Sequence, residues 1–169
     1  MFKNTIFRRM TALVLTLALA AAAALPGLAV YPMPIQTASE TEAVYLFNAD
    51  TGKTILNQNA DQQQYVASLT KLMTALLLLE SGKDLNDEVT VPTALTQEFR
   101  DIQNANGTTM GLRIGETVRR IDLLNAMLIV SANDAASVIA YDVGGSVLDF
   151  VKQMNARAQE LGCTGTNFT

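Results

Sequence analysis

The chain has 169 residues, of which 49% are hydrophobic and 17% charged, so its length allows one domain or part of a larger one. Its 16 acidic residues outnumber its 12 basic ones, and because phosphate binding needs clustered positive charge, no nucleic acid is expected as a partner. The absence of histidine excludes a Ser-His-Asp triad or a Cys-His pair within these residues, and neither a metal nor another cofactor is expected.

The first 29 residues have the pattern of a secretory signal peptide. The first ten carry three basic side chains and no acidic one, residues 11–25 are almost wholly apolar, and residues 26–29 (Pro-Gly-Leu-Ala) supply a small-x-small ending. The alternative is a retained membrane anchor, but the apolar run is shorter than the roughly 20 residues that a span needs. Either form predicts export to the cell envelope. Cleavage after Ala29 removes three basic residues and leaves 9 Lys and Arg against 16 Asp and Glu, a net charge of −7.

A β-hairpin is predicted at the start of the folded region. Residues 30–41 mix proline with small polar residues and are expected to form a flexible leader. The sequence then has a short apolar, aromatic run at residues 43–47, a turn composition at 48–53 and a returning apolar run at 54–56. We therefore predict two paired strands that open a domain extending over residues 42–169.

Four segments with apolar residues at helical spacing follow the hairpin. We predict helices from Leu69 to about Glu80, from Arg119 to Val130, from Ala135 to Val143 with Asp134 at its start, and from Val147 to Leu161. The first is apolar nearly all round, which places it in the middle of a core. An extended segment is expected at residues 89–92, whereas residues 93–118 are rich in Asn, Gly and Thr and show no clear periodicity. This order predicts an α+β fold, a helical region packed on an antiparallel sheet of which only the N-terminal hairpin is present.

The chain has one cysteine, Cys163, so it contains no internal disulfide. An exported domain without disulfides depends on its hydrophobic core. We expect Cys163 to be a small buried apolar residue of that core.

Ser68 and Lys71, at the head of the first predicted helix, are the first residues that could carry chemistry. Three positions apart, they project from the same helical face within reach of each other. The exposed N–H groups and the dipole at a helix N-terminus favour developing negative charge. A lysine buried beside an apolar helix loses some of its preference for the charged form and can then accept the serine proton. The alternatives are an ordinary N-cap serine and a solvated lysine.

Ser131-Ala132-Asn133, a short polar break between two predicted helices, is the second candidate. Taken alone it could be ordinary helix punctuation, with Ser131 or Asn133 as a cap. Joined with the Ser-x-x-Lys about sixty residues earlier, it matches a combination of motifs known from class A β-lactamases and penicillin-binding proteins.

With these motifs the chain resembles low-molecular-mass penicillin-binding proteins of the serine D-Ala-D-Ala carboxypeptidase type. Residues 67–75 (Ala-Ser-Leu-Thr-Lys-Leu-Met-Thr-Ala) are similar to the active-site helix of that family, and residues 128–136 (Leu-Ile-Val-Ser-Ala-Asn-Asp-Ala-Ala) to its second motif region. Further matches lie before the second motif and in the hairpin turn: Leu123-Leu124, Gly111-Leu112, Gly115-Glu116 and Asp50–Lys53. The resemblance covers nearly all of residues 42–169 and implies a β-lactamase/transpeptidase-like fold.

The resemblance also implies roles for the candidate residues. Ser68 is the nucleophile that attacks the carbonyl between the two terminal D-alanines of peptidoglycan stem peptides, and Lys71 accepts its proton. Ser131 passes a proton toward the leaving amine, and Asn133 positions Lys71 and binds the substrate. The N–H of Ser68 supplies half of an oxyanion hole, and water releases the acyl-enzyme. β-Lactams are then expected as covalent inhibitors, and a missing C-terminal segment is expected to provide a membrane association.

The chain departs from the family at the third motif, a Lys-Thr/Ser-Gly on a strand, which does not occur here. Residues 163–169 (Cys-Thr-Gly-Thr-Asn-Phe-Thr) resemble the start of the family's Thr-x-Phe segment. We therefore expect an N-terminal part of the catalytic domain, truncated before the third motif. Because the missing part would hold the other oxyanion donor and the grip on the substrate carboxylate, the 169-residue product alone is expected to have little or no activity.

Three alternatives stay open on the sequence alone. A β-lactamase of the same fold is disfavoured by Ser-Ala-Asn in place of Ser-Asp-Asn and by the lack of an assignable deacylating glutamate. A D,D-endopeptidase would cut cross-linked stem peptides in preference to a free pentapeptide. A non-catalytic cell-wall-binding relic would have no reason to keep its four polar side chains together: Ser68, Lys71, Ser131 and Asn133.

Overall fold

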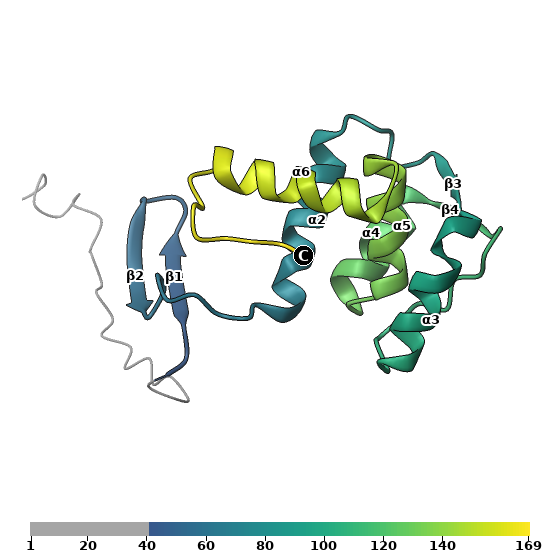
Figure 1. Cartoon of the computed structure of the whole chain (residues 1–169). Coiled ribbons are helices and arrows are strands. Elements are labelled where there is room, and N and C mark those ends of the chain that lie inside the picture. The colour runs from purple at the N-terminus through teal and green to yellow at the C-terminus, as the bar shows by residue number, and fades with distance from the viewer. Residues whose placement is uncertain (1–40) are drawn as a thin grey trace, which may run out of the picture. The chain divides into compact units, whose positions relative to one another are not determined.

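The computed structural model describes residues 41–169 (Figure 1). The predicted signal peptide, residues 1–29, and all but the last residue of the predicted leader lie outside the described residues. The chain divides into two compact units, Met1–Val44 and Tyr45–Thr169, and the second unit contains the helices and the candidate site.

The predicted hairpin is confirmed. Strands β1 (Val44–Asn48) and β2 (Lys53–Gln58) are paired, and the turn between them is closed by the N–H of Gly52, which donates to the carbonyl of Asn48 at 3.0 Å. Gly52 has φ +69°, a conformation that an L-residue with a side chain rarely adopts. The side-chain oxygen of Asn48 accepts a second bond from Thr51 N, so one Asn-x-x-Thr-Gly segment makes the whole turn.

The helical part is built around one central helix, α5 (Asn133–Gly144), which packs against four others (Figure 1). Those four are α2 (Thr70–Glu80), α3 (Thr96–Asn104), α4 (Arg120–Ile129) and α6 (Val147–Glu160). Two short 3₁₀ helices precede α2 and α3: η1 (Ala67–Leu69) and η2 (Thr93–Leu95). The four predicted helices are thus confirmed, and each end lies within two residues of the predicted one.

The core lies between α2, α4 and α5. Fully buried side chains from these three helices form its centre: Leu78, Leu123, Met127, Val138 and Ile139. A second, smaller cluster joins α5 to α6 through Ala140, Phe150 and Met154. At Gly144 the two helices come so close that a Cβ would lie 2.6 Å from the Cβ of Phe150, so only glycine fits there.

A second small sheet and a further helix were not predicted. Strand β3 (Glu88–Thr90) pairs antiparallel with β4 (Thr117–Arg119), with Val89 opposite Val118. Helix α3 lies inside the segment that shows no clear periodicity in the sequence. This second sheet is separate from the hairpin, and the predicted α+β class is confirmed.

Two burial predictions are also corrected. Helix α2 buries Thr74, Ala75 and Leu78, but Leu72 and Leu79 are 61% and 57% exposed, so one face of this apolar helix is uncovered in the described part of the chain. Cys163 is exposed, because it follows the end of α6 in a turn where the chain leaves the core.

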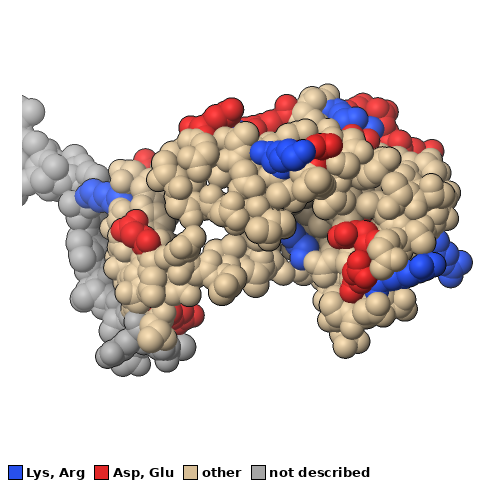
Figure 2. Space-filling view, in the orientation of Figure 1, with Lys and Arg blue, Asp and Glu red and all other residues tan. Residues whose placement is uncertain are grey.

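The surface carries both signs of charge. Figure 2 shows acidic and basic side chains interleaved on the face drawn, with broad uncharged areas between them. Within residues 41–169 no helix is long and apolar enough to cross a membrane. In the same part of the chain, no three His, Cys, Asp or Glu residues gather as a metal site would require.

Candidate active site

Two backbone positions in the left-handed region shape the candidate site. Ala67, with φ +47°, precedes Ser68 at the start of η1, and Ser131, with φ +61°, lies between α4 and α5. At Ser131 the chain turns back, and the N–H of Ala132 donates to the carbonyl of Ala126 at 3.2 Å, which ends α4. Strained backbone conformations of non-glycine residues cluster at functional sites, where surrounding structure holds them.

The four predicted site residues meet in one hydrogen-bonded cluster. Ser68 Oγ lies 2.8 Å from Ser131 Oγ, although the two residues are 63 positions apart. Lys71 Nζ donates to Ser131 Oγ at 3.1 Å and to Asn133 Oδ1 at 2.7 Å. Its distance to Ser68 Oγ is longer, 3.5 Å. The 3₁₀ helix η1 and the first turn of α2 thus place Ser68 and Lys71 against the start of α5.

Lys71 is the titratable group of this cluster. Partial burial lowers the pKa of Lys71 below its ordinary value, because less water remains to stabilise the ammonium form. Among residues 41–169 no acidic side chain forms an ion pair with it, so no opposite charge offsets this effect. The ammonium form satisfies its three N–H donors with three oxygens, those of Ser68, Ser131 and Asn133.

The geometry offers two paths for a proton between Ser68 and Lys71. The direct path spans 3.5 Å, which is long for a hydrogen bond. The path through the Ser131 hydroxyl uses two shorter contacts, 2.8 Å and 3.1 Å. Because a neutral amine has a lone pair and a hydroxyl both donates and accepts, the second path can move a proton from Ser68 to Lys71 in one concerted relay.

Asn133 is held by a loop that sequence reasoning did not connect to the site. Its backbone N–H and its side-chain Nδ2 both donate to the carbonyl of Thr108, at 2.8 Å and 3.1 Å. The neighbouring Asp134, predicted only as the start of a helix, is buried and accepts N–H bonds from the same loop. The sequence shows only an acidic residue in the first turn of a predicted helix, a common position that does not indicate burial or a contact with this loop.

A mixed helical and antiparallel fold that carries Ser-x-x-Lys at a helix start, in contact with Ser-x-Asn, is typical of penicillin-binding proteins and serine β-lactamases. The chain belongs to the D-alanyl-D-alanine carboxypeptidase family, whose sequence profile matches residues 32–169.

Individual relatives agree with this assignment. The chain is 34% identical over 137 residues to the D-alanyl-D-alanine carboxypeptidase DacF of Bacillus subtilis. The aligned region covers 79% of this chain and 33% of the relative. It is also 34% identical over 136 residues to the D-alanyl-D-alanine endopeptidase of Pseudomonas aeruginosa, covering 80% of this chain and 42% of that protein. The crystal structure of penicillin binding protein 5 from Haemophilus influenzae superposes with a TM-score of 0.59 at 34% identity, over 70% of this chain and 34% of the other. The chain therefore spans between a third and a half of the length of these proteins.

Proposed function

We propose that the protein carrying this sequence is a serine-type D-alanyl-D-alanine carboxypeptidase that removes the terminal D-alanine from peptidoglycan stem peptides. The observation that carries the proposal is the contact of Ser68, Lys71, Ser131 and Asn133 in one cluster, with Asn133 Oδ1 2.7 Å from Lys71 Nζ. These residues supply a nucleophile, a base of lowered pKa and a hydroxyl that joins them.

Acylation follows from this arrangement. Ser68 Oγ forms a bond to the carbonyl carbon between the two D-alanines, and its proton passes to Lys71 Nζ, directly or through the hydroxyl of Ser131. The tetrahedral intermediate then loses its C–N bond, and the leaving nitrogen takes a proton from the Lys71 ammonium through Ser131. The N–H of Ser68, near the start of α2, is proposed as one donor to the oxyanion.

Deacylation reverses the proton path. Water attacks the ester carbonyl and gives a proton to Lys71, and the bond between the carbonyl carbon and Ser68 Oγ breaks. The alkoxide of Ser68 recovers the proton from Lys71, so the site returns to its starting state. β-Lactams are proposed to acylate the same oxygen, and the resulting acyl-enzyme is proposed to be hydrolysed more slowly than the one formed from the peptide.

We also propose that the protein works in the cell envelope. The basic start, the apolar run and the small-x-small ending of residues 1–29 support export. A membrane association through a further C-terminal segment is part of the same proposal.

A D,D-endopeptidase is the second candidate, because an endopeptidase relative is as similar to this chain as a carboxypeptidase relative, at 34% identity in both cases. The two activities use the same attack on a D-alanyl carbonyl and differ in the leaving group. A free pentapeptide and a cross-linked dimer of stem peptides separate them, since only the endopeptidase prefers the dimer.

The test is an intact mass of the natural protein before and after benzylpenicillin, beside the variants Ser68→Ala and Ser81→Ala. Ser81 is a control serine at the other end of α2, where its hydroxyl donates a hydrogen bond to the carbonyl of Leu78. We expect one penicillin adduct on the natural protein and on Ser81→Ala, and none on Ser68→Ala. An adduct that persists on Ser68→Ala, or no adduct on the natural protein, would overturn the proposal.

A further inference from the structure

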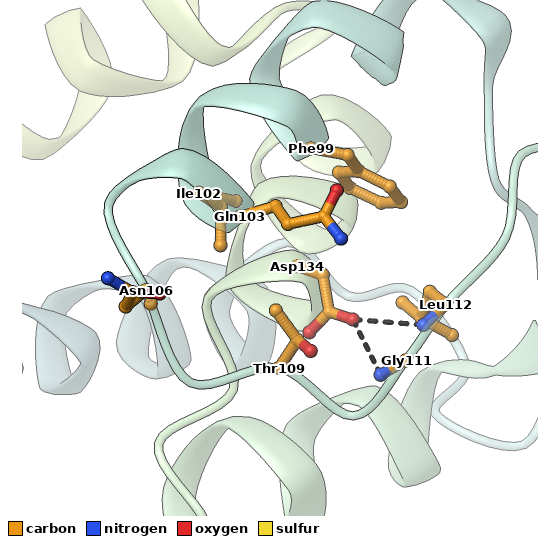
Figure 3. Close-up of a pocket in the computed structure, with 9 residues that line it drawn as sticks. Phe99, Ile102, Gln103, Asn106, Thr109, Gly111, Leu112 and Asp134 are labelled. Carbon is orange, nitrogen blue, oxygen red and sulfur yellow. Dashed lines mark hydrogen bonds between the residues drawn. The ribbon is translucent and has the colours of Figure 1, made fainter.

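Asp134 is a buried acidic residue whose carboxylate accepts hydrogen bonds only from backbone N–H groups in the described part of the chain. It is 2% exposed and is the second residue of α5. Its Oδ1 accepts from the N–H groups of Met110 and Ala135 at 3.0 and 2.9 Å, and its Oδ2 accepts from Gly111 and Leu112 at 3.0 Å each. Figure 3 shows the carboxylate between the helix and the loop that supplies Gly111 and Leu112.

Outside its bonds to Asp134, the loop of residues 107–112 is held at its first two residues, where Gly107 N–H donates to the carbonyl of Ile102 at 2.8 Å and the carbonyl of Thr108 accepts from Asn133. Residues 108–111 are exposed, and only Leu112 at the end of the loop is buried. Beside Asp134 lies a pocket of about 480 Å³, lined on the side of α3 by Phe99 and Ile102, so side chains do not fill the space next to the loop (Figure 3). The bonds to Asp134 are therefore the main restraint on residues 110–112, the second half of the loop.

This loop in turn fixes the amide of Asn133. The carbonyl of Thr108 accepts from the Asn133 side-chain Nδ2 at 3.1 Å. Because an amide donates from nitrogen and accepts at oxygen, that bond determines that Oδ1 faces Lys71 Nζ, 2.7 Å away. A displaced loop would leave the amide free to rotate and would deprive Lys71 of its shortest hydrogen bond.

Gly107 gives independent support for this coupling. A Cβ at this position would lie 3.0 Å from Asn133 Nδ2 and 3.0 Å from a side-chain methyl group of Ile102. The loop therefore passes so close to the Asn133 amide that a methyl group must displace one of them.

We propose that Asp134 is a positioning residue that sets the amide of Asn133, and through it the amine of Lys71, by anchoring the loop 107–112. The proposal rests on the proposed function for its consequence in catalysis, but the link from Asp134 to Lys71 is a property of the structure itself. Asp134 does not touch the reacting atoms.

The first test is an NMR titration of the lysine side-chain ¹³Cε signals in the full natural protein, with Lys71 assigned through Lys71→Arg. Asp134→Asn replaces one carboxylate oxygen, which accepts two bonds, by an NH₂ group that faces N–H donors. Gly107→Ala places a methyl group against the Asn133 amide and Ile102. In both variants Lys71 loses an acceptor that favours its ammonium form, so its titration midpoint is expected at lower pH than in the natural protein.

Asp142→Asn is the matched control. Asp142 is also a largely buried carboxylate on α5, but its partners are Arg120 and Lys83, and neither belongs to the loop. This variant is expected to lose stability and to keep the natural titration midpoint of Lys71. Thermal unfolding of each variant identifies the temperature at which all are folded for the comparison. If Asp134→Asn is not folded at any temperature tested, Asp134→Glu, which keeps a carboxylate but displaces its oxygens, takes its place, because Gly107→Ala tests only the contact between the loop and the Asn133 amide.

The second readout is the rate of acylation by benzylpenicillin. The rate is expected to fall on the order of 10- to 100-fold in Asp134→Asn and Gly107→Ala, because small displacements of a catalytic group have effects of this size. A Lys71 midpoint and an acylation rate unchanged in folded Asp134→Asn would overturn the proposal. A natural protein that is not acylated would contradict the proposed function alone, because the NMR titration would still decide the positioning role.

Discussion

Ser131 combines a strained backbone with a hydroxyl at the centre of the cluster. Its φ of +61° costs a residue with a Cβ roughly 1–2 kcal/mol relative to ordinary conformations. Its Oγ lies 2.8 Å from Ser68 Oγ and 3.1 Å from Lys71 Nζ. The left-handed turn aims the hydroxyl between the other two groups, so the strain and the chemistry belong to the same residue.

Two replacements of Ser131 separate these contributions. Ser131→Ala keeps the strain and removes the hydroxyl, whereas Ser131→Gly removes both. We expect both variants to lose most acylation by benzylpenicillin, and Ser131→Gly to be more stable to urea than Ser131→Ala by about 1 kcal/mol. If Ser131→Gly were acylated as fast as the natural protein, the backbone turn rather than the hydroxyl would be the contribution of this position.

At the scale of residues, the sequence predicts the members of the cluster but not what holds them. Ser68 and Lys71 are found from helical spacing, and their contact with Ser131 and Asn133 follows from the combination of motifs. The roles of Thr108 and Asp134 depend on where a loop without periodicity lies, which local spacing does not determine. The burial predicted for Cys163 is wrong for a related reason, because residue type alone does not show where the chain leaves the core.

At the scale of elements, the helices with several turns of apolar residues at helical spacing are predictable, and the short polar helix α3 is not. Helices α2, α4 and α5 contain apolar side chains in every turn. Helix α3 has only Phe99 and Ile102 within its bounds, and Leu95 lies one turn before Phe99. That i, i+4, i+7 pattern was present but short. The pairing of β3 with β4 joins segments 27 to 31 residues apart through three residues each, and such a distant register leaves no local signal.

The helices α4 and α5 are joined by an ion pair that is almost wholly buried. Arg120 Nε donates to Asp142 Oδ2 at 2.8 Å, and the two side chains are 11% and 12% exposed. Burial alone raises the pKa of Asp142, but the hydrogen bond and the charge of Arg120 outweigh it and hold that pKa below its ordinary value. Arg120 also donates to the carbonyl of Asp84, which ties the connection after α2 to the same pair.

Replacing Arg120 with methionine should therefore lower the free energy of unfolding by about 3–5 kcal/mol at pH 7, because Asp142 is left buried with only the longer contact to Lys83. A lowered folded-state pKa contributes stability above the unfolded pKa of about 4, and this contribution is lost as the pH falls through the folded value. The difference between Arg120→Met and the natural protein should then shrink toward acid pH. Urea unfolding at pH 7 and pH 3 measures both values, and a difference that stays constant would contradict the assigned role of the pair.

At the scale of the whole molecule, the described chain leaves large apolar side chains uncovered. Within the hairpin, Tyr45, Phe47 and Ile55 are 57%, 47% and 57% exposed. An isolated two-stranded hairpin is marginally stable in water, and an open strand edge is a template for pairing with another chain. The α+β class could be predicted from the order of elements, but the extent of this apolar surface could not, because it depends on which faces other parts of the chain cover.

Residues 30–169 produced alone should therefore associate with themselves through the hairpin. We expect the mass measured by light scattering to rise with protein concentration, over a range on the order of micromolar to millimolar, and an apolar dye to bind. Phe47→Thr with Ile55→Thr keeps residues that favour strands and removes apolar area, so this double variant should remain monomeric over a wider range. Leu148→Gln is the control, because Leu148 is 68% exposed on α6 and lies outside the hairpin. Equal association of the double variant and the control would show that the hairpin is not the surface responsible, and the uncovered face of α2 would then be the next surface to test.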